Sequence, residues 1–186
     1  MKVTPIEPNQ LLKILAMNRG IDVRIDERAV IKQDINIGNH VSIDVGVYIS
    51  TQAIIGDYVH IAPYCCIIGG IDGLFIMEDF ANLSAAVCIV VISDDFTKGM
   101  INPIVPAQYK YLIGKEIIMR RFSTVGANSV VLPNVEMAEG SMLGAGSLLN
   151  MSTEPWTIYA GHPARAIGKR DKTLILKAYN ELGYNY

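Results

Sequence analysis

Aliphatic residues recur at every sixth position over long stretches of this chain. The first run keeps this register without a break and consists of Ile25, Ile31, Ile37, Ile43, Ile49, Ile55, Ile61 and Ile67. Four residues after most of these stands a second apolar position that is small or β-branched, such as Val41 and Val47. After two interruptions the period returns, first at Met77, Leu83 and Ile89 and later at Met119, Val125, Val131, Met137, Leu143 and Leu149.

A period of six is not the period of an α-helix, whose apolar stripe recurs about every 3.6 residues. An ordinary strand alternates with a period of two and does not hold a strict six over so long a run. The pattern therefore predicts an all-β fold, a parallel β-helix in which each hexapeptide forms one short strand and one corner. Inward aliphatic residues would stack from coil to coil and supply most of the stability. This reasoning does not set the handedness of the coil.

The repeat predicts one domain over residues 1–186, with the β-helix at about 25–155. Four extra residues fall in a glycine-rich stretch at 69–76, and a longer break at about 93–118 predicts an extruded loop. Residues Gln10–Asn18 read as a short amphipathic N-terminal helix over the first coil. Residues 171–183 read as a C-terminal helix, which could cap the other end of the β-helix or pack on a neighbouring subunit.

Composition narrows the classes of function. The 186 residues carry 16 Lys and Arg against 18 Asp and Glu, a balance that disfavours general binding of nucleic acid. No apolar run reaches the roughly 18 residues that a bilayer span needs, so no membrane insertion is expected. The N-terminus lacks the order of a secretory signal, and three cysteines give no disulfide framework. A cytoplasmic setting is expected.

Several segments near the C-terminus resemble a known family. The stretches at 125–135 (VGANSVVLPNV), 143–147 (LGAGS) and 155–165 (PWTIYAGHPAR) are similar to the final coils of hexapeptide-repeat acyltransferases. The segment from Ser93-Asp94-Asp95-Phe96 to Pro106 resembles the sugar acetyltransferases of bacterial surface-polysaccharide pathways, relatives of the galactoside and maltose acetyltransferases. The resemblance covers about residues 25–170.

The resemblance implies a left-handed β-helix and a homotrimer with active sites between subunits. Acyl-CoA would lie in the groove between two β-helices, and the extruded loop would reach over the neighbouring subunit. The implied activity is transfer of an acetyl group from acetyl-CoA to a sugar hydroxyl in surface-polysaccharide biosynthesis. Two alternatives stay open: N-acetylation of a nucleotide-linked amino sugar, and a non-catalytic β-helix scaffold.

A general base is the first requirement of this chemistry, and histidine is the usual choice because it titrates near neutral pH. His60 occupies an outward corner position, one coil from Asn82, and the two are expected to line one groove. The family's histidine before the long loop is replaced here by Asp94. Either Asp94 or Asp95 binds the sugar or orients His60, or the acceptor is an amine that needs no strong base. The predicted catalytic residues are His60 and Asp94, with Asn82 and Asp95 binding substrate.

The cofactor residues follow from the resemblance. Small residues allow strand backbones to approach the amides of pantetheine, and cationic side chains suit its phosphates. The predicted set is Gly126, Ala127, Gly144, Ala145, Arg165 and Lys169.

The remaining histidines and cysteines are expected to play no catalytic part. His40 reads as a surface residue and His162 as part of a late turn. The three histidines are too far apart in the coils to form a zinc site, so no metal is expected. Cys66 and Cys88 read as corner residues that lack a neighbour able to stabilise a thiolate.

Overall fold

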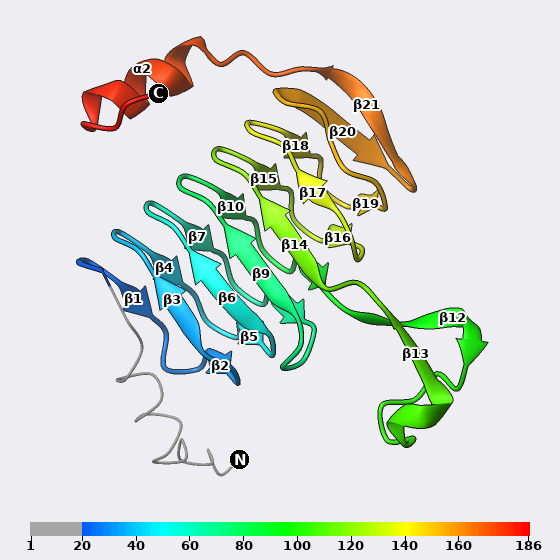
Figure 1. Ribbon diagram of the computed structural model, residues 1–186. Coiled ribbons are helices and arrows are strands. Elements are labelled where there is room, and N and C mark those ends of the chain that lie inside the picture. The colour runs from blue at the N-terminus through cyan, green and yellow to red at the C-terminus, as the bar shows by residue number, and fades with distance from the viewer. Residues whose placement is uncertain (1–19) are drawn as a thin grey trace.

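Short strands follow one another around a three-sided solenoid (Figure 1). This computed structural model describes residues 20–186, so the helix expected at Gln10–Asn18 lies outside the described residues. Face I is the sheet made of β1 (Arg24–Ile25), β4 (Ser42–Ile43), β7 (His60–Ile61), β10 (Asn82–Leu83), β15 (Thr124–Val125), β18 (Met142–Leu143), β20 (Thr157–Gly161) and β21 (Ala164–Lys169).

The other two faces complete each coil. Face II consists of β2 (Val30–Ile31), β5 (Tyr48–Ile49), β8 (Cys66–Ile68), β11 (Cys88–Val90), β16 (Val130–Val131) and β19 (Leu148–Leu149). Face III consists of β3 (Ile35–Ile37), β6 (Gln52–Ile55), β9 (Leu74–Met77), β14 (Glu116–Met119) and β17 (Glu136–Met137). Neighbouring strands are parallel throughout the faces, except that β21 folds back antiparallel on β20.

The period-six residues form the core, as the sequence predicts. Ile43 pairs with Ile61, Ile61 with Leu83, and Leu83 with Val125, so equivalent positions stack along the solenoid axis. All four are almost fully buried, at 0–1% exposure. A buried aliphatic side chain contributes roughly 1.5–3 kcal/mol, and the repeated stack is therefore the main source of stability.

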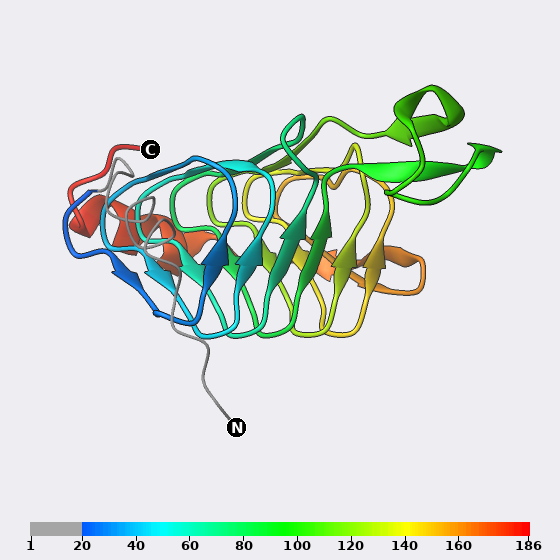
Figure 2. The same cartoon turned by 90° about the horizontal axis from the view of Figure 1, so that it is seen from below.

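The long insertion is an ordered hairpin. Strands β12 (Ser93–Gly99) and β13 (Lys110–Ile113) pair antiparallel, with a short 3-10 turn, η1 (Ala107–Tyr109), between them. The hairpin projects away from the solenoid at the corner between faces II and III (Figure 2). The boundary predicted at 118 was too late, because β14 already pairs with β9 from Glu116 onward and buries Ile117 and Met119.

The C-terminal part departs from two expectations. The solenoid extends beyond residue 155, since β20 still pairs parallel with β18. After β21 the chain turns back, and α2 (Thr173–Glu181) lies along the corner between faces III and I (Figure 1). Of the two placements that the sequence left open, the cap over the far end of the β-helix is wrong, because the buried Tyr179 packs on aromatic side chains of the corner.

Candidate active site

The corner between faces III and I, here called the aromatic corner, is filled and covered. One ring from each successive coil stands in a column that runs from His40 through Tyr58 and Phe80 to Phe122, with Trp156 at its end. Tyr58 and Phe80 stack at 4.8 Å between centroids with an interplanar angle of 9°. Aromatic pairs of this kind stabilise by about 0.5–1.5 kcal/mol each beyond their buried area.

The C-terminal segment closes the aromatic corner. Tyr179 of α2 meets Phe80 and Phe122 edge-on at 5.3 and 5.1 Å between ring centroids. Beyond the helix, the Tyr184 hydroxyl donates a 2.7 Å hydrogen bond to Asp57 Oδ2. Burial raises the pKa of the Asp57 carboxyl, but hydrogen bonds from Asn39 and Tyr184 outweigh it and lower this pKa below 3.8. This corner is thus a structural seam.

The corner between faces I and II, here called the small-residue corner, has the opposite character. Strand register places Ser84, Gly126, Gly144 and Ala160 in one column, because Leu83, Val125, Leu143 and Tyr159 pair in turn. A Cβ atom on Gly126 would lie 2.5 Å from Ala145 N, so at Gly126 the coils pack too closely for a side chain. The structure brings together the predicted residues Gly126, Ala127, Gly144 and Ala145.

Backbone groups at this corner are available to a ligand. Within the described part of the chain, the N–H groups of Ala127 and Ala145 donate no hydrogen bond. Ala145 is exposed and Ala127 half-buried. Beneath them, the buried Ser129 hydroxyl donates to Gly144 O at 2.9 Å and accepts from Ser147 N at 3.1 Å. This hydroxyl holds the turn, and the N–H groups of Ala127 and Ala145 that have no acceptor within residues 20–186 suit the amides of a pantetheine arm.

The two predicted phosphate-binding residues lie at the C-terminal end of face I. Arg165 and Lys169 are exposed residues of β21, where they pair with Ala160 and Thr157 of β20. Lys169 Nζ donates a 2.7 Å hydrogen bond to Thr157 Oγ1, and Arg165 Nη1 donates to Ala164 O at 2.8 Å. Arg165 therefore stands beside Ala160, in continuation of the small-residue corner, whereas Lys169 lies beside Thr157 at the opposite end of β20.

His60 and Asn82 lie one coil apart as predicted. They are direct register partners on face I, and the His60 side chain is 47% exposed. A carboxylate that was not predicted meets the histidine: Asp44 Oδ2 lies 2.8 Å from His60 Nε2. Asp44 also accepts a 3.0 Å hydrogen bond from the Ser42 hydroxyl. The carboxylate next to His60 within one protomer is therefore Asp44, from the preceding coil.

Asp94 and Asp95 lie in β12 at the base of the hairpin, on a different side of the solenoid from His60. Asp94 pairs with Leu112 across the hairpin. Asp95 Oδ1 accepts hydrogen bonds from the Thr97 hydroxyl at 2.6 Å and the Thr97 N–H at 2.9 Å, and these bonds lower its pKa. One protomer thus does not bring these aspartates to His60, and any meeting of the two groups requires a second copy.

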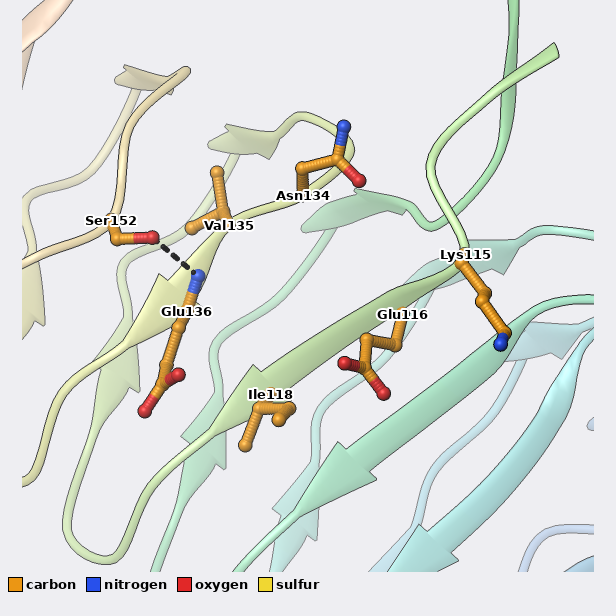
Figure 3. A pocket seen from close by; sticks show the side chains of 7 residues that line it. All are labelled: Lys115, Glu116, Ile118, Asn134, Val135, Glu136 and Ser152. Atoms are coloured by element: carbon orange, nitrogen blue, oxygen red, sulfur yellow. Dashed lines mark hydrogen bonds between the residues drawn. The ribbon is translucent and has the colours of Figure 1, made fainter.

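The hollow at the root of the hairpin lies on face III and contains none of the predicted residues. It has a volume of about 270 Å³ and is lined by Lys115, Glu116, Ile118, Asn134, Val135, Glu136 and Ser152 (Figure 3). Ser152 Oγ accepts a 3.0 Å hydrogen bond from Glu136 N. Lys115, Glu116 and Asn134 bring a positive charge, a negative charge and an amide to the lining of this hollow.

The other predicted placements are partly revised. His40 is a surface residue, and it begins the aromatic column. Cys66 and Cys88 lie in strands β8 and β11 and not at corners, because each precedes the inward residue of its hexapeptide. Among the described residues there is no cluster of three or more His, Cys, Asp or Glu placed to hold a metal. No helix in residues 20–186 is long and apolar enough to cross a membrane.

Known proteins resemble this chain over nearly its whole length. A dTDP-4-amino-4,6-dideoxy-D-glucose acyltransferase of Escherichia coli is 35% identical over 163 residues, which are 84% of this chain and 83% of that enzyme. AntD, an N-acyltransferase from Bacillus cereus, solved with dTDP and 3-hydroxybutyryl-CoA, superposes with a TM-score of 0.87. It is 32% identical, with 97% of this chain and 98% of AntD covered. No family model matches the sequence.

The solenoid, its extruded hairpin and its open small-residue corner define a hexapeptide-repeat acyltransferase with a left-handed β-helix. More narrowly, the chain belongs to the same acyltransferase family as the E. coli enzyme and AntD. The predictions of fold and of acyl transfer are confirmed, and the scaffold alternative has no support. The finer resemblance to galactoside and maltose acetyltransferases is not confirmed.

The sequence reasoning did not single out Ser84 or Asp44. Solved AntD structures include variants at an aspartate numbered 94 and a serine numbered 84. This chain carries Asp94 and Ser84 at the same numbers. A usable signal for Ser84 was its position directly after an inward leucine, the place that Gly126 and Gly144 occupy in later coils.

Proposed function

We propose that this protein transfers an acyl group from acyl-CoA to the amino group of a dTDP-linked 4-amino-4,6-dideoxy sugar. The observation that carries the proposal is the match to AntD in complex with dTDP-4-amino-4,6-dideoxyglucose and CoA. That match has a TM-score of 0.87 and covers 95% of this chain. The sugar hydroxyl, the leading acceptor from sequence reasoning, gives way to the amine. Surface-polysaccharide biosynthesis and a cytoplasmic location fit this acceptor and stay part of the proposal.

The acyl donor is proposed to lie along the small-residue corner. The free N–H groups of Ala127 and Ala145 face its pantetheine amides, and Gly126 and Gly144 allow the close approach. Arg165 and Lys169 then meet its phosphates at the end of face I. In support, the solved AntD complexes contain CoA or 3-hydroxybutyryl-CoA.

The active site is proposed to be completed by a second copy of the chain in a homotrimer. The hairpin carries large exposed apolar side chains, with Phe96 73%, Ile104 88% and Leu112 56% exposed. The hairpin that carries them projects away from its own solenoid (Figure 2), and exposed apolar area of this kind marks an interaction surface. A hairpin that reaches the small-residue corner of its neighbour would bring Asp94 and Asp95 toward the partner's His60 and Asn82.

The reaction joins the sugar amine to the thioester carbonyl. The amine nitrogen attacks, the carbon–sulfur bond breaks, CoA leaves as the thiol, and the nitrogen loses one proton. His60, oriented by Asp44, and Asp94 are the two proposed acceptors of that proton, while Asn82 and Asp95 position the sugar. An amine without its ammonium proton is a good nucleophile, so the side-chain base matters less here than it would for a hydroxyl acceptor.

A comparison of acceptors tests the reaction. Purified protein is given acetyl-CoA or 3-hydroxybutyryl-CoA with dTDP-4-amino-4,6-dideoxyglucose, with dTDP-glucose as the hydroxyl-only control, and thiol release is followed. Release is expected with the amino sugar and not with dTDP-glucose. Equal release with both acceptors, or release with neither, contradicts the proposal.

Substitution of His60 tests the base. His60→Ala is expected to lower turnover by about 100-fold, the usual scale for losing a general base. His40→Ala serves as the matched control and should leave turnover unchanged. Wild-type turnover in His60→Ala would remove His60 from the chemistry and leave Asp94 as the remaining candidate.

Removal of a positive charge tests whether Arg165 and Lys169 bind the phosphates of the acyl donor. Arg165→Ala and Lys169→Ala are each expected to raise the acyl-donor KM about tenfold, since a hydrogen bond to a charged group contributes about 1.5 kcal/mol. Turnover at saturating donor should stay near that of the wild type. Unchanged KM values for both variants would show that the phosphates of the donor bind elsewhere.

A further inference from the structure

Two free cysteines lie side by side on face II. Strands β8 and β11 pair in parallel, and Cys66 stands directly opposite Cys88 in that register. Both side chains point outward, because the next residues, Ile67 and Ile89, are the buried inward positions. Neighbouring parallel strands lie about 4.8 Å apart, which falls within the roughly 4.4–6.8 Å that Cα atoms span in disulfides.

The two thiols are register neighbours and, among residues 20–186, form no ion pair with a cationic side chain. Both cysteines are half-buried. Burial raises the pKa of both thiols. Their register neighbours in the flanking coils are Tyr48 and Val130, which carry no positive charge. The pair therefore lacks the neighbouring positive charge that stabilises a catalytic thiolate. Its geometry nevertheless allows the two sulfur atoms to form a bond with each other.

The third cysteine does not share this arrangement. Cys65 faces the core at 0% exposure, and its thiol donates a 3.1 Å hydrogen bond to Ser84 O. Burial raises its pKa to about 11. Although Cys65 is adjacent to Cys66 in sequence, it points to the opposite side of the sheet, as successive residues of an extended chain do.

We propose that Cys66 and Cys88 form a dithiol site that reacts with low-molecular-weight disulfides and closes to an inter-coil disulfide. The thiolate of one cysteine attacks a sulfur of the small disulfide, whose S–S bond breaks and releases one thiol. The thiolate of the other cysteine attacks the protein sulfur of this mixed disulfide and releases the second small thiol. The protein dithiol loses two electrons and two protons, and the small disulfide becomes two thiols.

The location gives the bond a structural consequence. Strand β11 ends at Val90, and the hairpin strand β12 begins at Ser93. A link between Cys66 and Cys88 therefore ties the coil from which the hairpin leaves to the coil before it. The proposal stands independently of the acceptor and donor proposed above, because it rests on the register of two strands of face II.

The test uses the full native chain with oxidised glutathione, followed by alkylation, intact mass measurement and peptide mapping. The wild type is expected to lose two hydrogen atoms in mass and to give one linked peptide pair that contains Cys66 and Cys88. Dithiothreitol should restore the starting mass. Cys65→Ala, in the core, should still form the link, whereas Cys66→Ser and Cys88→Ser should stop at a glutathione adduct.

Several results would overturn the proposal. These are a native protein that does not react, a stable glutathione adduct on the wild type with no internal link, and a link that involves Cys65. The peptide map of the wild type shows whether Cys66 and Cys88 are linked, even where a cysteine variant folds poorly. A reaction that speeds up as pH rises from about 7 to 9 is also expected, because the thiolate is the attacking species.

Discussion

The aromatic corner and the small-residue corner are built on the same turn of the same repeat, yet one is closed and the other open. Phe80 in the first and Ala86 in the second both adopt positive φ, at 60° and 57°. The backbone is therefore alike, and the difference lies in the side chains that the turn carries. Rings stack into a column that α2 covers, whereas alanines and glycines leave amides exposed.

With the donor site proposed above, this contrast separates residues that stabilise the fold from residues that bind the donor. At the aromatic corner, ring pairs and the C-terminal segment add packing to coils that already stack through their cores. At the small-residue corner, the side chains contribute little packing, and the buried serines hold the backbone instead. Substitutions at the aromatic corner should accordingly change the free energy of unfolding, and substitutions at the small-residue corner should change the KM for acyl-CoA.

The largest expected effect is on stability at the aromatic corner. Tyr179 is 4% exposed and contacts Phe80, Phe122 and Tyr184. Tyr179→Ala should lower the free energy of unfolding by about 3 kcal/mol, in the range for large-to-small aromatic substitutions. Urea unfolding followed by circular dichroism measures it.

A tyrosine at the other corner provides the control. Tyr64 is 65% exposed, so Tyr64→Ala should cost about 0.5 kcal/mol or less, as surface substitutions do. Equal losses for the two variants would show that α2 adds nothing to the seam.

The second effect is on donor binding at the small-residue corner. Ala145→Phe should fill the strip in front of the free amides and raise the acyl-CoA KM about tenfold, which corresponds to about 1.4 kcal/mol. The melting temperature should change little, because Ala145 is exposed. Ala178→Phe, on the exposed side of α2, is the matched control. An unchanged KM in Ala145→Phe would place the donor outside this corner.

The smallest effect concerns pH and the C-terminal segment. The pKa of Asp57 is lowered in the folded protein, so its contribution is present above pH 3.8 and is lost as the pH falls through the folded value. Tyr184→Phe removes the hydrogen bond to this carboxylate and should cost about 1 kcal/mol at pH 7, within the range for bonds to charged groups after allowance for partial exposure.

The pH dependence sharpens this test. The difference in melting temperature between wild type and Tyr184→Phe should shrink below about pH 4, because protonated Asp57 no longer favours the bond. A difference that stays constant between pH 7 and pH 3 would mean that Tyr184 acts through ring packing alone. Thermal melts across that pH range give the answer.

Much of the site could be predicted where residues obey the repeat. His60 and Asn82 were placed together by counting hexapeptides across the four-residue insertion, and the register confirms the pair. The small residues Gly126 and Gly144 came instead from the family resemblance, and the register places them in adjacent coils. Asp44 was missed, because the contact depends on how the His60 side chain leans toward the preceding coil. Counting sequence positions does not show the direction in which the His60 side chain points.

The sequence by itself determined the inner surface of this protein. Each hexapeptide forms its own strand, and the position of a residue within the hexapeptide decides whether it is buried. The periodicity of the sequence is therefore enough to specify the coil and its core. Only the tertiary structure decided which outward residues meet outside the repeat register. That outcome depends on the return path of α2 to the aromatic corner, the direction of the hairpin and the lean of His60 toward Asp44. Such contacts join segments far apart in the chain, and side-chain packing between coils sets them.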